Sequence, residues 1–213
     1  MPIYYEDASI RIHKINCGPY DNNAYLIVDP ATEAGIVIDA PAESEKVLAE
    51  VGGAKIKAII ISHTHRDHIL GFDVMVDALK APVGCHPQDA HLLPRPADFN
   101  LADNEAISFG GQEATFLFTP GHTPGGTCTL VGRHLFPGDV LFPGGPGRTT
   151  SPENFLQLVA NIRERILVLP DDVEVYPGHG SNTTLKESKE EYASFASRPH
   201  PSDLSGDVLW LKI

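Results

Sequence analysis

One apolar run constrains the fold more than any other part of the chain: the segment KAIIIS at residues 57–62. Its isoleucines are β-branched and do not alternate with polar residues, which is typical of a strand covered on both faces. Directly after it come His63, His65, Asp67 and His68. Imidazole and carboxylate groups are costly to hold beside a buried strand without partners. The sequence therefore predicts a layered fold with a polar site at the end of this strand.

The rest of the chain alternates strands and helices in two successive sets, which favours an α/β (α+β) fold with sheets packed together and helices outside. We expect strands at residues 10–15, 24–28, 35–40, 81–85, 113–120, 126–132 and 134–139, and a strand-to-loop unit at 171–180. We expect helices at residues 42–51, 71–80, 151–170 and 183–196. Ser151 is the expected N-cap of the third helix, with Pro152 at its first position.

Two segments are less regular. Residues 86–104 are expected to form a loop with a short helix, and residues 198–213 a docked strand. No internal repeat or low-complexity linker is visible in the sequence, so we predict a single domain over residues 1–213.

Charge and composition restrict the partners of this protein. The chain has 213 residues, is 42% hydrophobic and carries a formal net charge of −12 at pH 7. This acidic balance argues against binding to nucleic-acid phosphates and against docking on anionic lipid. No apolar run approaches the roughly 18 residues of a membrane span, and the N-terminal sequence has no signal-peptide pattern. The three cysteines are odd in number and lack a CxxC pair, as in reduced cytosolic proteins.

From these properties we expect a cytoplasmic protein with no nucleic-acid or membrane partner. The oligomeric state is left open, with a homodimer as one alternative.

Three further loops present metal-type side chains directly after expected strands: His122 in PGHTPGG, Asp139 in PGDVLF and His179 in PGHG. Loops at one edge of a sheet can bring residues that are distant in sequence together. Neutral imidazole and carboxylate suit Zn, Fe and Mn, whereas Mg and Ca prefer oxygen ligands. With the four residues that follow the 57–62 strand, these candidates are too many for one tetrahedral ion with an open position, but they suit two ions.

The spacing of the candidates suggests how they divide. His63 and His65 are one residue apart on an extended turn and can point into one cavity. Asp67 and His68 are adjacent, so their side chains are expected to diverge and can serve a neighbouring metal. Asp139 can bridge the two ions, because a carboxylate has two oxygens. A water held between the ions would ionise near neutral pH and become a nucleophile.

The ordered set HTHRDH, His122, Asp139, His179 resembles the metallo-β-lactamase superfamily, whose pattern is HxHxDH…H…D…H. The segments GPYDNNAYLIVD and GIVIDAP also resemble that family's opening strands. The resemblance implies a four-layer αββα sandwich with a dinuclear site at one edge. It further implies a first ion held by His63, His65 and His122, a second ion held by Asp67, His68 and His179, and Asp139 as the bridge.

Within the superfamily, PGHTPGG and GDVLFPGGPGR are most similar to the glyoxalase II-like group, which hydrolyses thioesters such as acylated glutathione. The resemblance implies a hydrolase in which a hydroxide bridging two divalent ions attacks a thioester, ester or related carbonyl of a small-molecule substrate. Zinc is the first choice of metal, with iron or manganese as alternatives. Asp67 is the candidate catalytic residue, orienting the nucleophile while it binds metal. Arg148 matches a basic position of the family and can hold a substrate carboxylate, a solvated loop charge being the alternative interpretation.

Two departures from the glyoxalase II pattern leave the substrate open. That enzyme ends in a sizeable helical domain that helps bind glutathione, whereas 34 residues follow His179 here. Thr150 also stands where the family has a tyrosine. A second hypothesis is a mononuclear iron dioxygenase acting on glutathione persulfide, which would use only His63, His122 and Asp139. A third is a metal-dependent binding protein without turnover.

Residues outside the motif carry weaker expectations. Tyr20 and Asn22, in the early turn, can face the metal pocket from across the cleft. Arg66 does not fit a ligand role and is expected to point to solvent. Phe195 and Trp210 are expected to cap the core or to form an oligomer contact.

Overall fold

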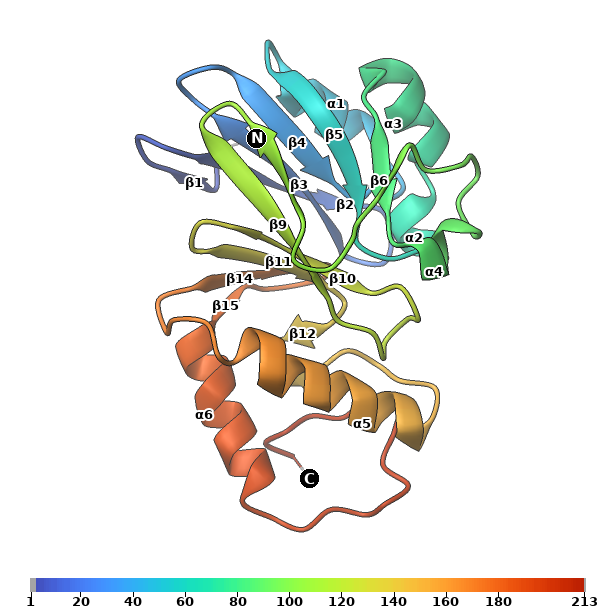
Figure 1. Ribbon diagram of the computed structural model, residues 1–213, viewed down its shortest axis with the longest axis vertical. Helices are drawn as coiled ribbons and strands as arrows, with labels where there is room; N and C mark the ends of the chain where they lie inside the picture. The colour runs from blue at the N-terminus through green and yellow to red at the C-terminus, as the bar shows by residue number, and fades with distance from the viewer. Residues whose placement is uncertain (1–2, 213) are drawn as a thin grey trace.

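The computed structural model describes residues 3–212, which form four layers in the order helices, sheet, sheet, helices (Figure 1). This confirms the αββα sandwich that the family resemblance implies. None of the helices within residues 3–212 has the length and apolar character that crossing a bilayer requires.

The first sheet has seven strands that neighbour one another in chain order. They are β1 (Tyr5–Glu6), β2 (Arg11–Cys17), β3 (Asn22–Asp29), β4 (Ala34–Ile38), β5 (Lys55–Ile61), β6 (Val83–Cys85) and β7 (Phe99–Asn100). Neighbouring strands from β1 to β4 are antiparallel, and those from β4 to β7 are parallel. Parallel strands are normally covered on both faces, as the apolar run in β5 predicts.

The second sheet has six strands in the order β15-β14-β11-β10-β9-β8. They are β8 (Ala106–Phe109), β9 (Gln112–Phe118), β10 (Thr127–Val131), β11 (His134–Gly138), β14 (Glu174–Pro177) and β15 (Thr183–Thr184). Among the described strands of this sheet, only β11 and β14 pair in parallel. A small hairpin of β12 (Leu141–Phe142) and β13 (Gly145–Pro146) follows β11.

Helices cover the outer face of each sheet. In Figure 1, α1 (Glu45–Val51) and α3 (Phe72–Leu79) lie against the first sheet, and α5 (Pro152–Asn161) and α6 (Leu185–Ala196) against the second. Ser151 Oγ accepts a hydrogen bond from Asn154 N–H at the start of α5, as an N-cap should. The predicted 151–170 helix ends early: α5 passes into one π-helical turn, η1 (Ile162–Ile166), and regular helix stops there. Two four-residue helices, α2 (Arg66–Ile69) and α4 (Pro87–Ala90), lie near the end of β5.

The alternation of side chains along β5 assigns its isoleucines to two cores. Ile60 lies in the cluster between the sheets with Tyr25 and Phe136. Ile59 and Ile61 lie in the cluster under the helices of the first sheet. All three isoleucines are fully buried, so the end of β5 is held from both sides.

The closing segment is not the strand predicted for residues 198–213, of which Ile213 lies outside the described residues. The chain here is irregular and makes only one isolated β-bridge among the residues described, between Gly206 and Thr149. Trp210 nevertheless is fully buried beside Phe195 and Tyr192. The segment therefore docks by side-chain packing, and both aromatic residues cap the core as expected.

Candidate metal centre

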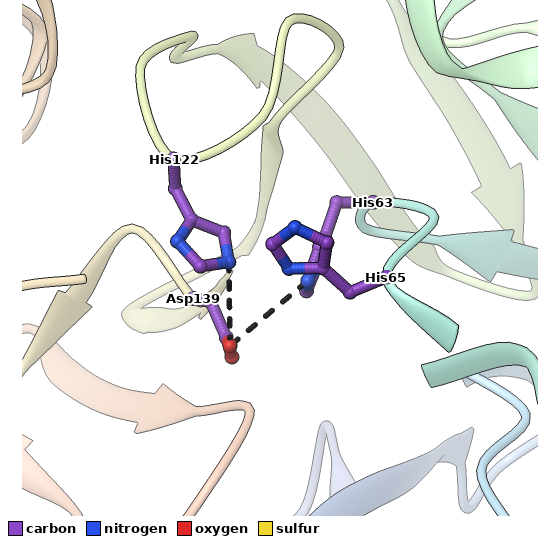
Figure 2. Close-up of side chains that lie close together, drawn as sticks. All are labelled: His63, His65, His122 and Asp139. Atoms are coloured by element: carbon purple, nitrogen blue, oxygen red, sulfur yellow. Dashed lines mark ion pairs between the residues drawn. The ribbon is translucent and has the colours of Figure 1, made fainter. Parts of the chain in front are cut away.

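Seven side chains gather in two adjoining groups at one edge of the sandwich. The first group is His63, His65, His122 and Asp139, and the second is Asp67, His68 and His179. Within each group the potential ligand atoms lie within 4.8 Å of one another. Figure 2 shows the first group: His63 and His65 come from the turn after β5, His122 from the β9–β10 loop and Asp139 from the end of β11. The structure thus brings together all seven residues predicted from the sequence.

The loops that carry these residues are tied to each other through the backbone. Thr127 N–H donates to the Ser62 carbonyl at 3.0 Å, joining the start of β10 to the end of β5. Gly178 N–H donates to the Gly138 carbonyl at 2.9 Å, joining the ends of β14 and β11. Buried Asp89, in α4, accepts from Gly125 N–H at 2.7 Å and from Thr64 N–H at 3.3 Å. The centre is therefore built on strand ends rather than on free loops.

Asp139 lies between the two groups. Its Oδ2 is 3.5 Å from His122 Nε2 and 3.9 Å from His63 Nε2, contacts drawn as dashed lines in Figure 2. Its Oδ1 is 3.4 Å from His68 Nε2, and its Oδ2 is 3.4 Å from His179 Nε2. This arrangement suits the bridging role predicted for Asp139.

The expectation that Asp67 and His68 diverge is wrong. Their facing atoms, Asp67 Oδ2 and His68 Nε2, lie 3.6 Å apart, and His179 Nε2 is 3.2 Å from the same carboxylate oxygen. The reason is local: both residues belong to the single turn of α2, and in a helix adjacent side chains are not opposed as they are in an extended strand.

Hydrogen bonds at the far side of three rings, those of His68, His122 and His179, aim Nε2 at the centre. Nδ1–H of His122 donates to the Arg148 carbonyl at 2.7 Å, and Nδ1–H of His179 donates to the Tyr20 carbonyl at 2.7 Å. His68 Nδ1 lies 2.9 Å from Asp39 Oδ2. A carbonyl or carboxylate can only accept, so each of these rings keeps a proton on Nδ1, and its Nε2 is the atom left for a metal, which would displace any proton held there.

Asp39 is a supporting residue that the sequence did not reveal. It follows β4, has a φ of 62° and is fully buried. Besides His68, it accepts hydrogen bonds from Ser62 N–H and Ser62 Oγ–H, each at 2.8 Å. The sequence signal was one aspartate in GIVIDA, which alone does not distinguish a buried acceptor from a turn residue.

The residues fit a bound metal. Ten buried side-chain nitrogen or oxygen atoms among the described residues lack a hydrogen-bond partner, and three of them lie in this centre: His63 Nε2, His122 Nε2 and Asp139 Oδ1. Unpaired buried polar atoms are uncommon and destabilising in folded proteins. All three belong to the groups described above, and a divalent cation among them would satisfy each one.

The ionisation of the centre also favours cation binding. Burial lowers the pKa of His63 far below its usual range, as do the neighbouring histidines. Burial alone would raise the pKa of Asp139, but His68 and His179 outweigh it and hold that pKa well below its usual range. Burial opposes protonation of His179, yet hydrogen bonds to Asp139 and Asp67 raise its pKa to about 10. The acidic side chains thus draw positive charge into the centre, and a metal cation can supply it.

A cavity of about 490 Å³ opens beside the second group. Its lining residues are Tyr20, Arg66, Asp67, Leu70 and His179. Tyr20 faces the site as expected, and Asn22 Nδ2–H donates to Asp67 Oδ2 at 2.9 Å. Arg66 is exposed as predicted, but it borders this cavity instead of pointing only to bulk solvent.

Arg148 lies elsewhere. Its guanidinium Nε is 3.8 Å from Asp207 Oδ2, its side chain is 73% exposed, and it borders a separate cavity with residues 207–209. Only its backbone carbonyl reaches the centre, through His122. Its substrate role stays a prediction.

Comparison with known proteins identifies the class. Residues 17–195 match the model of the metallo-beta-lactamase superfamily, and the chain belongs to that superfamily. It is 30% identical to a probable metallo-hydrolase of Streptococcus pyogenes, covering 88% of this chain and 91% of that protein. It is 36% identical to a hydroxyacylglutathione hydrolase of Rhodopseudomonas palustris, covering 75% of this chain and 62% of that protein.

Solved structures agree with this assignment. ETHE1 from Myxococcus xanthus superposes with a TM-score of 0.78 at 26% identity, covering 88% of this chain and 85% of that one. TTHA1623 in a di-iron-bound form superposes with a TM-score of 0.71 at 32% identity, covering 83% of this chain and 96% of that one. The protein is therefore a member of a metallo-hydrolase superfamily whose histidine and aspartate cluster is suited to divalent metals.

Proposed function

We propose that this protein is a hydrolase that holds two divalent ions and cleaves a thioester, ester or related carbonyl in a small molecule. The observation that carries the proposal is the position of Asp139. Its Oδ1 faces His68 at 3.4 Å and its Oδ2 faces His122 at 3.5 Å, so one carboxylate addresses both groups of ligands. A carboxylate shared in this way is what two neighbouring ions require.

Metal ions bound there would polarise a carbonyl and lower the pKa of water. The chain's own residues do the positioning. Asn22 and His179 hold Asp67 Oδ2 at 2.9 Å and 3.2 Å, which fixes this carboxylate on the cavity wall. We propose that Asp67 orients the nucleophile by accepting a hydrogen bond from it, while it also serves as a ligand.

The relatives support hydrolysis without specifying the substrate. The hydroxyacylglutathione hydrolase matched above acts on a thioester of glutathione by its name, but this chain spans only 62% of its length, so glutathione is left out of the proposal. Zinc is the first choice of metal, with iron or manganese as alternatives, because histidine and aspartate bind all three. The di-iron form of TTHA1623 supports iron as an alternative.

The test combines metal content with turnover. Purified protein is expected to hold close to two metal ions per chain and to hydrolyse members of a thioester, ester and lactone panel. His65→Ala should lose most bound metal and activity while its circular dichroism spectrum is kept, because His65 is exposed and contributes little packing. His91→Ala, an exposed histidine outside both groups, is the matched control. Unchanged metal content and turnover in His65→Ala would show the assignment to be wrong.

A mononuclear iron dioxygenase is the second candidate. Two observations favour it: the likeness to ETHE1, and the fact that the unpartnered buried atoms within the centre belong to His63, His122 and Asp139, the three ligands this alternative needs. A content of one iron ion per chain, together with oxygen consumption when glutathione persulfide is added, would support the dioxygenase and contradict the hydrolase proposal. Bound metal with no turnover on either panel would favour the binding protein instead.

A further inference from the structure

Arg66 differs from every other arginine of the chain. The sequence has eight arginines, and seven of them make a side-chain hydrogen bond or ion pair within residues 3–212. The pairs are Arg11 with Glu6, Arg95 with Asp77, Arg133 with Tyr5, Arg148 with Asp207, Arg163 with Glu164, Arg165 with Asp103, and Arg198 with the Trp210 carbonyl. Arg66 has no such partner among the residues described, although the chain carries a net charge of −12.

The position of Arg66 makes this unpaired charge informative. It lies between the metal-type residues His65 and Asp67 in sequence, at the first position of α2, and borders the cavity of about 490 Å³. The same cavity is lined by Asp67 and His179 of the second ligand group. A molecule that reaches the metal centre through this cavity therefore passes the Arg66 side chain.

The remaining walls of the cavity are apolar. Tyr20 is 61% exposed and Leu70 is 44% exposed, and both are large side chains that a folded protein usually covers further. Exposed apolar groups around one polar anchor are characteristic of small-molecule sites. The guanidinium has five donors in a fixed fork that matches a carboxylate in two parallel hydrogen bonds.

We propose that Arg66 is the anion-binding residue of the substrate site. The substrate carries a carboxylate that pairs with Arg66 and an apolar or aromatic body that packs on Tyr20 and Leu70. This role differs from the one predicted for Arg148, whose guanidinium already faces Asp207 beside another cavity. That the bound molecule is then hydrolysed rests on the proposed function, whereas binding of its carboxylate by Arg66 does not.

The binding test uses 4-phenylbutanoate and 4-phenylbutanamide, which match in shape and differ in charge. Each is titrated by ligand-observed NMR into metal-loaded and metal-free protein. The wild type is expected to prefer the carboxylate by about tenfold or more, the range for a hydrogen bond to a charged group. Arg66→Gln should lose this preference in both forms. Arg163→Gln, an arginine in η1 away from the centre, is the matched control.

The outcomes separate the alternatives. A preference that survives metal removal and disappears only in Arg66→Gln supports the proposal. A preference that vanishes with the metal and persists in Arg66→Gln means that the metal itself binds the carboxylate, and it overturns the proposal. Loss of the preference in Arg148→Gln, with Arg66→Gln unchanged, also overturns it and restores the role predicted for Arg148.

A kinetic test separates this inference from the proposed function. With 4-nitrophenyl acetate and mono-4-nitrophenyl glutarate as a neutral and an anionic ester, Arg66→Gln should raise KM about tenfold for the glutarate alone. If the wild type hydrolyses neither ester nor any member of the panel, the hydrolase proposal fails, while the NMR preference still decides the role of Arg66. If it hydrolyses both and Arg66→Gln changes neither KM, Arg66 is not the anion site.

Discussion

Asp39→Asn tests how the metal centre is held, because the substitution changes one buried group and almost no volume. Asp39 is 1% exposed. Its Oδ1 accepts from Ser62 N–H at 2.8 Å, and its Oδ2 accepts from Ser62 Oγ–H at 2.8 Å and faces His68 Nδ1 at 2.9 Å. An asparagine that keeps the first bond points its NH₂ group at His68 Nδ1, where donor would meet donor. The imidazole can avoid this only by moving its proton to Nε2, the atom that binds metal.

The size of the effect follows from these contacts. Loss of a partner that orients a ligand histidine typically lowers metal affinity 10- to 100-fold, about 1.4 to 2.7 kcal/mol. We expect this loss in the group formed by Asp67, His68 and His179. The group of His63, His65 and His122 does not contact Asp39 directly through a ring nitrogen and should keep its affinity to within a few-fold.

The assay is competition for zinc against a chromophoric chelator, which separates the affinities of the two proposed sites in one titration. Asp29→Asn is the control, because Asp29 is also buried and accepts backbone hydrogen bonds, but it lies at the opposite end of β3 from Asn22. Both variants should lower the melting temperature, and only Asp39→Asn should weaken one zinc site. Equal zinc affinities in the two variants would refute the reasoning and leave Asp39 a purely structural residue.

Two further changes test packing and pH dependence. Gly178→Ala should lower hydrolytic activity at least tenfold, because the new methyl group would overlap Asp139 Oδ1 and lie 2.7 Å from His68 Cε1. Gly132→Ala is the control for turnover, because nothing lies close to its Cβ, although the positive φ of Gly132 means that this variant loses some stability. His134 is buried against Tyr176, and burial, then Arg133, lowers its pKa to about 4 from 6.5. The unfolded chain therefore protonates His134 more readily than the folded protein does. Neutral His134 contributes to the free energy of unfolding above pH 6.5, and this contribution, at most about 3 kcal/mol, is lost as the pH falls toward 4. Chemical denaturation at pH 7 and pH 4.5 should show a smaller difference for His134→Gln than for the wild type, and an equal difference would count against this assignment.

The sequence predicts the centre of this fold well because its strongest signals are local. The run of isoleucines before His63 shows where a covered strand ends, and β5 is buried on both faces there. Each remaining ligand candidate follows its own strand, so a layered fold brings them to one edge. Neither inference requires knowing which strands are neighbours.

What the sequence does not predict depends on neighbours that are distant along the chain. Asp39 supports His68 because β4 and β5 pair in parallel, with Ile38 opposite Ile60, and no local pattern gives that register. The segment VLWLKI has apolar residues typical of a strand, yet its described residues 208–212 join no sheet, and Trp210 holds the segment in the core. Arg66 is exposed as the sequence predicts, but no local pattern shows that the turn of α2 also places it on the cavity wall.

Three proline-glycine pairs, at residues 137–138, 146–147 and 177–178, place a glycine against Asp139. A Cβ at Gly147 would overlap the Asp139 carbonyl, a Cβ at Gly178 would overlap its carboxylate, and Gly138 has a φ of 52°. The three glycines come from the ends of β11 and β14 and from the segment after β13, so backbone from three segments packs closely around Asp139. A metal-binding side chain that could adopt several conformations would not need backbone packed this closely around it. Because the neighbouring backbone leaves Asp139 little room to move, its two oxygens stay directed at both ligand groups, as the proposed bridge between two ions would require.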